Sequence, residues 1–225
     1  MSNLSSVEKL YDAIDRELSW RKQELVLIRA QVHTHPSEES VAFLLTVRAS
    51  IALLYAHWEG SIKNIAKRYL DHVFAQQRQY RELKLNFIAI AMKGEAAKWM
   101  QSKKASLHTL YLSHFSNILD EPLHKLSDEI ISTESNLSSK VLGEILTTIG
   151  IAETEFETDY VLIDYSLLKI RNDVAHGDVL KEKGFDKKRY LELHDTVLRL
   201  IETFSEQVKN AAMNKTYLSY SNEKE

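Results

Sequence analysis

Residues 41–58 read VAFLLTVRASIALLYAHW, with apolar side chains nearly all round a helix and neither glycine nor proline. Because a helix that is apolar on every side is normally a buried one, we expect this stretch to form the core of a helical protein. Its continuation to about residue 77 places Lys63, Lys67 and Arg68 beside apolar side chains. The second half is therefore predicted to be amphipathic, with one face toward solvent.

The sequence on both sides of this helix has helical periodicity as well. Apolar residues recur three and four positions apart over residues 6–32 and again over 186–213. The first helix is interrupted at residues 33–36, after which Ser-Glu-Glu at 37–39 offers N-cap and first-turn chemistry for the next one. Six glycines and two prolines in 225 residues leave room for few tight turns. We predict an all-α fold, a bundle of long antiparallel helices.

The middle of the chain predicts shorter elements. Helical candidates lie at residues 80–93, 95–101, 104–119 and 122–132, and we interpret residues 79–135 as a helical insertion into a simpler bundle. Asn136-Leu137-Ser138-Ser139 is expected to cap another short helix that ends at Gly150, before an acidic connector over residues 151–158. The chain is predicted to form a single domain over residues 1–218, followed by a disordered polar tail over residues 219–225.

Composition limits the classes of function. The net charge of −3 gives no general attraction to nucleic acid, so binding of a polyanion would need a local basic patch. The chain has no cysteine, which excludes disulfides, thiolate catalysis and cysteine zinc sites and is consistent with a reducing compartment. The N-terminus lacks the pattern of a signal peptide, and no stretch is expected to reach the length and composition of a membrane span. We expect a cytoplasmic protein that is not inserted in a membrane.

One short motif carries specific chemistry. Arg171-Asn172-Asp173-Val174-Ala175-His176 closes a helix predicted over residues 160–175, and Gly177 is well placed to stop that helix. Residues four apart share a helical face, so Asn172 and His176 lie together and the long Arg171 side chain can reach the same cleft. Histidine can exchange a proton near neutral pH. Taken by itself, the spacing also suits solvated helix charges with a histidine that merely caps the helix end.

The surrounding sequence resembles the HEPN superfamily, and within it the branch grouped as RiboL-PSP-HEPN. Three segments carry the resemblance, in the family's order: Tyr55-Ala56-His57-Trp58-Glu59-Gly60-Ser61-Ile62-Lys63-Asn64, Asn136 to Leu142, and Leu167 to Gly177 with its Arg-polar-x3-His block. The last is the most specific of the three, and together they cover most of residues 40–205. The resemblance implies a HEPN-type helical bundle with the additional short helices in the middle of the chain.

The resemblance also implies a metal-independent endoribonuclease that acts as a homodimer, with the Arg-His helices of two subunits lining one cleft. Cleavage of RNA by its own 2′-hydroxyl needs a base, an acid and donors to the phosphoryl oxygens. Two copies of His176 would supply the base and the acid, and two copies of Arg171 the donors. The resemblance implies supporting roles for Asn172, Asp173 and Glu59. For Glu59, pairing with Lys63 at i+4 remains an equal alternative.

The biological role implied is that of a toxin or an anti-phage defence effector, held in check by an inhibitory antitoxin or another partner protein. The alternative is a non-catalytic HEPN-type module for dimerisation or for nucleotide or protein binding. His57 and Trp58 are interpreted as core or interface residues.

Basic residues after the Arg-His helix, Lys181, Lys183, Lys187 and Lys188, are candidate contacts for the RNA backbone. Tyr190 could stack on a base, although its place on the apolar face of the last helix favours the core. His33 and His35 have a metal-compatible spacing but no third ligand nearby, so we expect a connector and predict neither a metal nor a cofactor. The sequence lacks the motifs of zinc metalloproteases, P-loop NTPases, dinucleotide enzymes and serine-elbow hydrolases.

Overall fold

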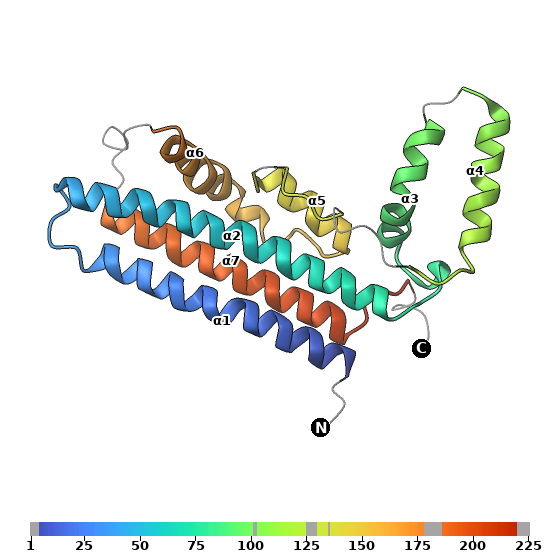
Figure 1. Cartoon of the computed structure of the whole chain (residues 1–225), viewed down its shortest axis with the longest axis horizontal. Helices are drawn as coiled ribbons and strands as arrows, with labels where there is room; N and C mark the ends of the chain where they lie inside the picture. Colours follow the sequence, from blue (N-terminus) through green and yellow to red (C-terminus); the bar gives the residue numbers. More distant parts are fainter. Residues whose placement is uncertain (1–4, 101–102, 125–129, 135, 178–185, 220–225) are drawn as a thin grey trace.

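The computed structural model describes residues 5–100, 103–124, 130–134, 136–177 and 186–219. Three long helices form the body of the molecule: α1 (Ser6–His33), α2 (Val41–Ala75) and α7 (Lys187–Met213) (Figure 1). The prediction of an all-α bundle is confirmed. Helix α1 runs antiparallel to the other two, as expected, whereas α2 and α7 run in the same direction because the chain returns across the bundle before α7 begins.

The core lies where these three helices meet. Its largest fully buried side chains come mainly from α2 and α7 and include Phe43, Trp58, Tyr69, Tyr190 and Phe204. Each long helix starts with a side-chain cap on the orphan N–H groups of its first turn. The caps are Ser5 for α1, Ser40 for α2 and Asp186 for α7. Ser40 rather than the predicted 37–39 stretch caps α2, because the Ser40 side chain accepts the hydrogen bond of the Phe43 N–H at 3.0 Å.

The prediction for the second half of α2 is confirmed, because its apolar side chains face the bundle while Arg68 and Asp71 are exposed. The prediction for the first half was wrong, because this half leaves one apolar face open: Val41 is 75% exposed and Leu45 66%. Helix α2 is also long and apolar enough to cross a bilayer, contrary to expectation, and 44% of its most apolar window is buried inside the bundle. Composition alone does not show which face of α2 is exposed, because burial depends on where the neighbouring helices lie.

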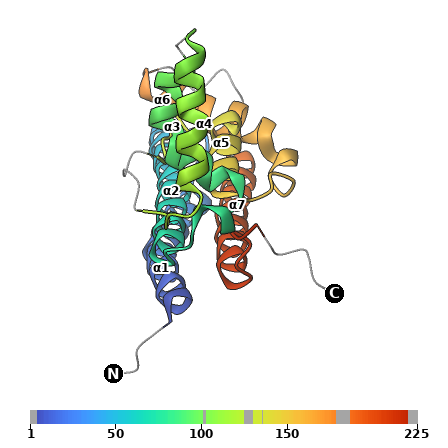
Figure 2. The ribbon, with the colours of Figure 1, turned by 90° about the vertical axis from the view of Figure 1, so that its right-hand side faces the viewer.

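A hairpin of two helices, α3 (Leu85–Met100) and α4 (Ala105–Ile118), projects from one end of the bundle. Figure 2, which faces that end, shows the hairpin rising above the long helices. Its base is a 3-10 turn, η1 (Tyr80–Glu82), held by the Tyr80 N–H, which donates to the Glu121 carbonyl at 3.0 Å. In the chain, this hairpin lies between α2 and α5.

Three boundaries differ from prediction, two in the middle of the chain and one near its C-terminal end. Helix α3 starts at Leu85 and continues through Gly94, since an interior glycine costs only about 1 kcal/mol among good helix formers. The described residues of the expected 122–132 helix are not helical; the Leu123 N–H donates to the Arg78 carbonyl at 2.8 Å instead, and residues 125–129 lie outside the described part. Ser219, expected to begin the disordered tail, donates to the Glu82 carbonyl at 2.8 Å, while residues 220–225 lie outside the described part.

Helix α5 (Ser139–Ile149) and the segment that follows lie across α2 on the side away from α1. The predicted caps of α5 are confirmed: the Ser138 side chain accepts from the Val141 N–H, and Gly150 adopts a left-handed conformation with φ 73°. After a 3-10 turn, η2 (Glu157–Asp159), the chain enters the helix that carries the motif. These elements connect the hairpin to the candidate site.

Stability should fall as pH drops below about 6.5, because two histidines are buried in their neutral form. Burial lowers the pKa of His57, with the Arg21 charge adding and Glu24 opposing, and burial also lowers the pKa of His72. A lowered folded-state pKa means that the unfolded chain binds more protons, so stability is full above the unfolded pKa and is lost as pH falls toward the folded one. Urea unfolding at pH of about 7.5 and about 5.5 measures this, and a His57→Gln, His72→Gln variant should show a smaller difference. Equal stability of the wild type at both pH values would contradict the prediction.

Candidate active site

The helix predicted over residues 160–175 forms, but not as a regular α-helix. Residues Leu162–Leu168 make a π-helical segment, η3, and α6 (Lys169–Ala175) continues from it. Short π-helical turns widen a helix locally and are frequent at functional sites. Ile163, Leu167 and Ile170 are buried and anchor the segment on the bundle. The motif therefore lies on the outer end of a firmly packed helix.

Gly177 ends this helix as predicted, with a left-handed φ of 85°. His176 is the C-cap residue, and its backbone N–H donates to the Asn172 carbonyl at 2.9 Å. The side chain of His176 is exposed. The imidazole thus lies at the surface, at the end of a helix that is anchored by buried side chains.

Arg171 is held by three groups. Its guanidinium carbon lies 4.1 Å from the centroid of the Tyr55 ring, and its Nη1 donates to the Asn172 Oδ1 at 2.8 Å. Its Nη2 lies 3.9 Å from the Glu59 Oε2, and the side chains of both residues are 23% exposed. A cation stacked on an aromatic face and bonded at one edge keeps its orientation. Arg171 is thereby positioned with part of its donor edge open to solvent.

Two of the supporting residues contact Arg171 rather than His176. Asn172 holds the guanidinium through its side chain and the histidine only through its backbone. Glu59 reaches toward Arg171 from α2, and no Glu59–Lys63 ion pair is found, although both residues are described. Asp173 is partly buried at the same helix end. The structure thus brings Arg171, Asn172 and Glu59 together, with His176 one turn further along.

Two residues near the motif were not among the sequence candidates. Tyr55 is 2% exposed, and its hydroxyl accepts the Leu137 N–H at 2.6 Å. Burial raises the pKa of Tyr55 to about 12, and the charge of Glu59 adds to the effect, so the phenol stays neutral. Arg48 donates to the Val174 carbonyl at 3.4 Å. The sequence could have pointed to Arg48, because it is the one Lys, Arg, Asp or Glu in the apolar stretch 41–58.

The three segments singled out in the sequence meet at this place. Tyr55 and Glu59 come from α2, the Leu137 N–H from the chain before α5, and Arg171 from α6. Ser139 ties the last two together, since its N–H and its hydroxyl donate to the Asp164 carboxylate at 2.8 and 2.6 Å. The segment around Asn136 therefore fixes the helix that carries the motif.

Three other residues of the first segment, His57, Gly60 and Asn64, face α1 instead. His57 is 4% exposed and Trp58 is fully buried, as expected for core residues. The His57 Nε2 lies 3.1 Å from the Glu24 Oε2, and its Nδ1 lies 3.4 Å from the Arg21 Nη1. One segment of α2 thus contacts α1 with one face and the candidate active site with another.

Of the four basic residues proposed as RNA contacts, the structure describes Lys187 and Lys188. The Lys187 Nζ donates to the His35 carbonyl at 3.1 Å, so this ammonium is engaged at the turn between α1 and α2. The Lys188 side chain is 84% exposed and lies 3.9 Å from Glu192. Lys181 and Lys183 lie outside the described residues. Tyr190 is fully buried, which excludes it from stacking on a base in this fold.

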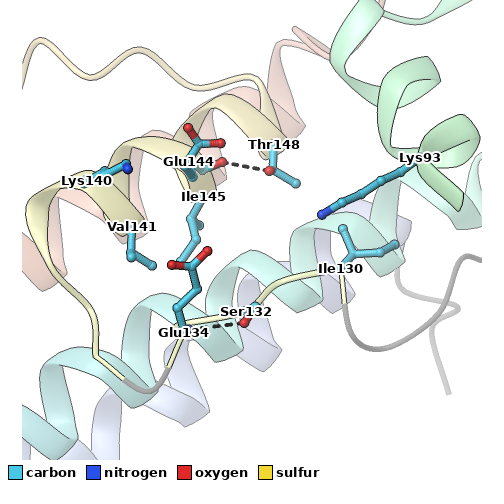
Figure 3. A pocket seen from close by; sticks show the side chains of 9 residues that line it. All are labelled: Lys93, Ile130, Ser132, Glu134, Lys140, Val141, Glu144, Ile145 and Thr148. Atoms are coloured by element: carbon cyan, nitrogen blue, oxygen red, sulfur yellow. Dashed lines mark hydrogen bonds between the residues drawn. The ribbon is translucent and has the colours of Figure 1, made fainter. Parts of the chain in front are cut away.

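Among the described residues, no group of three or more histidine, aspartate or glutamate side chains is placed to hold a metal ion. The His35 ring packs on Phe43, with centroids 5.3 Å apart. A cavity of about 310 Å³ lies between α3, α5 and residues 130–134, away from Arg171 and His176 (Figure 3). It is lined by two lysines and two glutamates among other residues, so its formal charges balance.

The family model described as RiboL-PSP-HEPN matches residues 16–210 of the chain. That range includes α2, α5 and the whole Arg171–His176 motif. No curated protein and no solved structure matches the chain.

Proposed function

The chain belongs to the RiboL-PSP-HEPN family, and from this and the geometry around Arg171 we propose that it is a metal-independent endoribonuclease. HEPN domains are generally associated with ribonuclease activity or nucleotide-related roles. The observation that carries the proposal is the arrangement of one oriented guanidinium and one exposed imidazole at the same helix end. These are the groups that transesterification of RNA requires.

In the proposed reaction, a neutral His176 removes the proton of the 2′-hydroxyl, and the 2′-oxygen attacks the adjacent phosphorus. The bond from phosphorus to the 5′-oxygen breaks, and a protonated His176 gives its proton to that oxygen. The products are a 2′,3′-cyclic phosphate and a 5′-hydroxyl. Arg171 donates hydrogen bonds to the phosphoryl oxygens as negative charge builds on them.

Each chain has one His176, whereas the reaction needs a base and an acid on opposite sides of phosphorus. We therefore propose a homodimer in which two copies of the motif share one cleft. The family and the chemistry support this arrangement. Control by an inhibitory partner, and a role as a toxin or anti-phage effector, are part of the same proposal. Growth arrest of a bacterial host on expression of the wild type, absent for an Arg171→Ala variant, would test that role.

The test of the activity is incubation of the purified protein with total RNA in excess EDTA. Wild type is expected to produce fragments with 2′,3′-cyclic phosphate ends, and an Arg171→Ala, His176→Ala double variant purified in the same way should produce none. Cleavage that stops in EDTA, or that the double variant retains, would contradict the proposal. Intact RNA with wild type would favour the alternative, a non-catalytic module for dimerisation or ligand binding.

A further inference from the structure

The first half of α2 exposes an unbroken apolar stripe. Every exposed residue between positions 41 and 56 is apolar, a set that we call the α2 stripe: Val41, Ala42, Leu45, Ala49, Ala52, Leu53 and Ala56. The solvent face of a surface helix is normally charged and polar. Figure 1 shows this half of α2 with α6 on one side and α7, followed by α1, on the other. The stripe therefore has the composition of a contact surface.

The spacing of the stripe is that of a helix-helix seam. Ala42, Leu45, Ala49, Ala52 and Ala56 are separated by three, four, three and four residues. Apolar residues in this alternation form the buried seam of paired helices. Small side chains at most of these positions allow a partner helix to approach at the short end of the usual 8–10 Å range. The partner expected on such a seam is another helix.

The candidate site flanks the middle of the stripe. Helix α6 is bonded to α2 at Arg48, through the Val174 carbonyl, and at Tyr55, through the Arg171 guanidinium. These two residues bracket Ala49 and Ala52, the centre of the seam. Whatever covers the stripe at its centre therefore comes to lie beside Arg171 and His176.

Charge favours a second copy of this chain in an antiparallel arrangement. A two-fold axis brings identical residues together, and the exposed residues of the stripe carry no charge that would repel its own copy; the neighbouring Arg48 donates to the Val174 carbonyl of α6. The chain before the stripe exposes Glu38 and Glu39, and beyond it Lys63 and Lys67 continue along the same helical face. No ion pair is found for either lysine within the described residues. Antiparallel pairing places the acidic end of one α2 beside the basic end of the other.

We propose that the α2 stripe is the surface on which two copies of this chain pair, antiparallel, about a two-fold axis near Ala49 and Ala52. In that arrangement the axis is perpendicular to α2, so both α6 helices lie on the same side of the helix pair. Parallel pairing would put them on opposite sides. The two Arg171–His176 pairs thus face one cleft. The role of this dimer in forming a shared active site rests on the proposed function, whereas the location of the interface rests on the exposed apolar residues of the α2 stripe.

The absence of cysteine from the chain allows a direct test. Ala49→Cys and Ala52→Cys variants are oxidised, and a disulfide forms where two Cα atoms come within about 7 Å. We expect disulfide-linked dimers at Ala49 or Ala52 and none at Ala42→Cys, which antiparallel pairing places far from its own copy. Ala89→Cys, an exposed position on α3, is the matched control. Cross-linking at neither central position, or equally at Ala42, overturns the proposal.

A second test separates the interface from the activity. Light scattering should give twice the 26.0 kDa chain mass for wild type and for Ala89→Glu, and the single-chain mass for Ala49→Glu with unchanged helicity. A wild-type monomer, or an Ala49→Glu dimer, overturns the interface, whatever the RNA assay shows. A dimer broken by Ala49→Glu, together with wild type that leaves RNA intact, supports the interface and rejects the ribonuclease. Flotation of a wild-type monomer with lipid vesicles would assign the stripe to a membrane surface instead.

Discussion

His176→Ala is expected to lower the rate of RNA cleavage by about 10²- to 10⁴-fold, the usual contribution of a positioned acid or base. Both proton transfers fall on this residue in the proposed dimer, so the upper part of the range applies. The substitution removes an exposed side chain at a helix end and should leave the fold unchanged. Rates in excess EDTA, with thermal unfolding as the fold control, measure the effect.

Arg171→Ala should cost about 10²- to 10³-fold, because it removes preorganised donors to the developing negative charge. Arg171→Lys should recover only part, since an ammonium neither stacks on Tyr55 in the same way nor presents two parallel donors. Lys169→Ala, exposed on the same helix, is the control and should keep full activity. If the His176→Ala variant cleaved RNA at the wild-type rate, His176 would have no role in the mechanism.

Mixing the subunits distinguishes a shared site from two independent ones. When wild type is mixed and reassembled with an excess of His176→Ala, a shared site predicts activity that falls with the square of the wild-type fraction. At equal amounts, about one quarter of the dimers contain two wild-type chains. A linear dependence on the wild-type fraction would show that each chain cleaves alone.

Arg21→Met is expected to reduce the free energy of unfolding by about 3–5 kcal/mol, the usual cost of leaving one partner of a buried ion pair alone. The Arg21 and Glu17 side chains are 8% and 10% exposed and lie 2.8 Å apart. Burial alone would raise the pKa of Glu17, but hydrogen bonds from Asn64 and Arg21 and the nearby charges lower it. Without Arg21 the carboxylate loses a principal partner in a place with little water.

Arg29→Met on the same helix is the matched control. Arg29 also meets a carboxylate, Asp195 of α7, at 2.8 Å, but these side chains are 38% and 53% exposed. An exposed pair of this kind contributes about 1 kcal/mol or less. Urea unfolding of the two variants compares the contributions, and a Glu17→Gln, Arg21→Met double variant should recover part of the loss. Equal effects of Arg21→Met and Arg29→Met would show that burial does not govern these pairs.

The position of the Arg21 guanidinium also explains why residue 60, in the segment from Tyr55 to Asn64, is a glycine. A Cβ at Gly60 would lie 2.7 Å from the Arg21 Nη2, so glycine at this position makes room for a buried arginine from another helix. The sequence showed that the segment from Tyr55 to Asn64 resembles a family motif, but it did not show which of its residues lie at the candidate site and which contact α1. Tyr55 and Glu59 serve the candidate site, whereas His57, Gly60 and Asn64 serve the network on α1.

Local signals in the sequence were sufficient for many features of the fold. Helical periodicity, the cap of α5 within Asn136–Ser139, and Gly150 and Gly177 as stops depend on residues within one turn of each other. The same holds for the order of Arg171, Asn172 and His176 along a helix end. Such features are properties of a short stretch of chain, so they can be read without knowing its neighbours.

Where hydrogen bonds cross between distant segments, sequence was insufficient. The described residues of the expected 122–132 helix are not helical, and the Leu123 N–H donates to the Arg78 carbonyl instead. The apolar stretch of α2 looked like core all round, yet α1, α7 and α6 leave one face uncovered. Periodicity reports that a side chain is apolar, whereas burial depends on which element lies against it.

The sequence by itself determined that this is a helical chain with an Arg-x4-His motif ended by a glycine, because those are local patterns of residue type and spacing. Only the tertiary structure decided that Arg171 stacks on Tyr55, that Arg48 reaches the end of α6, and that an apolar stripe runs beside them. These contacts join residues more than a hundred positions apart. Their geometry is set by how whole helices pack, which no local pattern encodes.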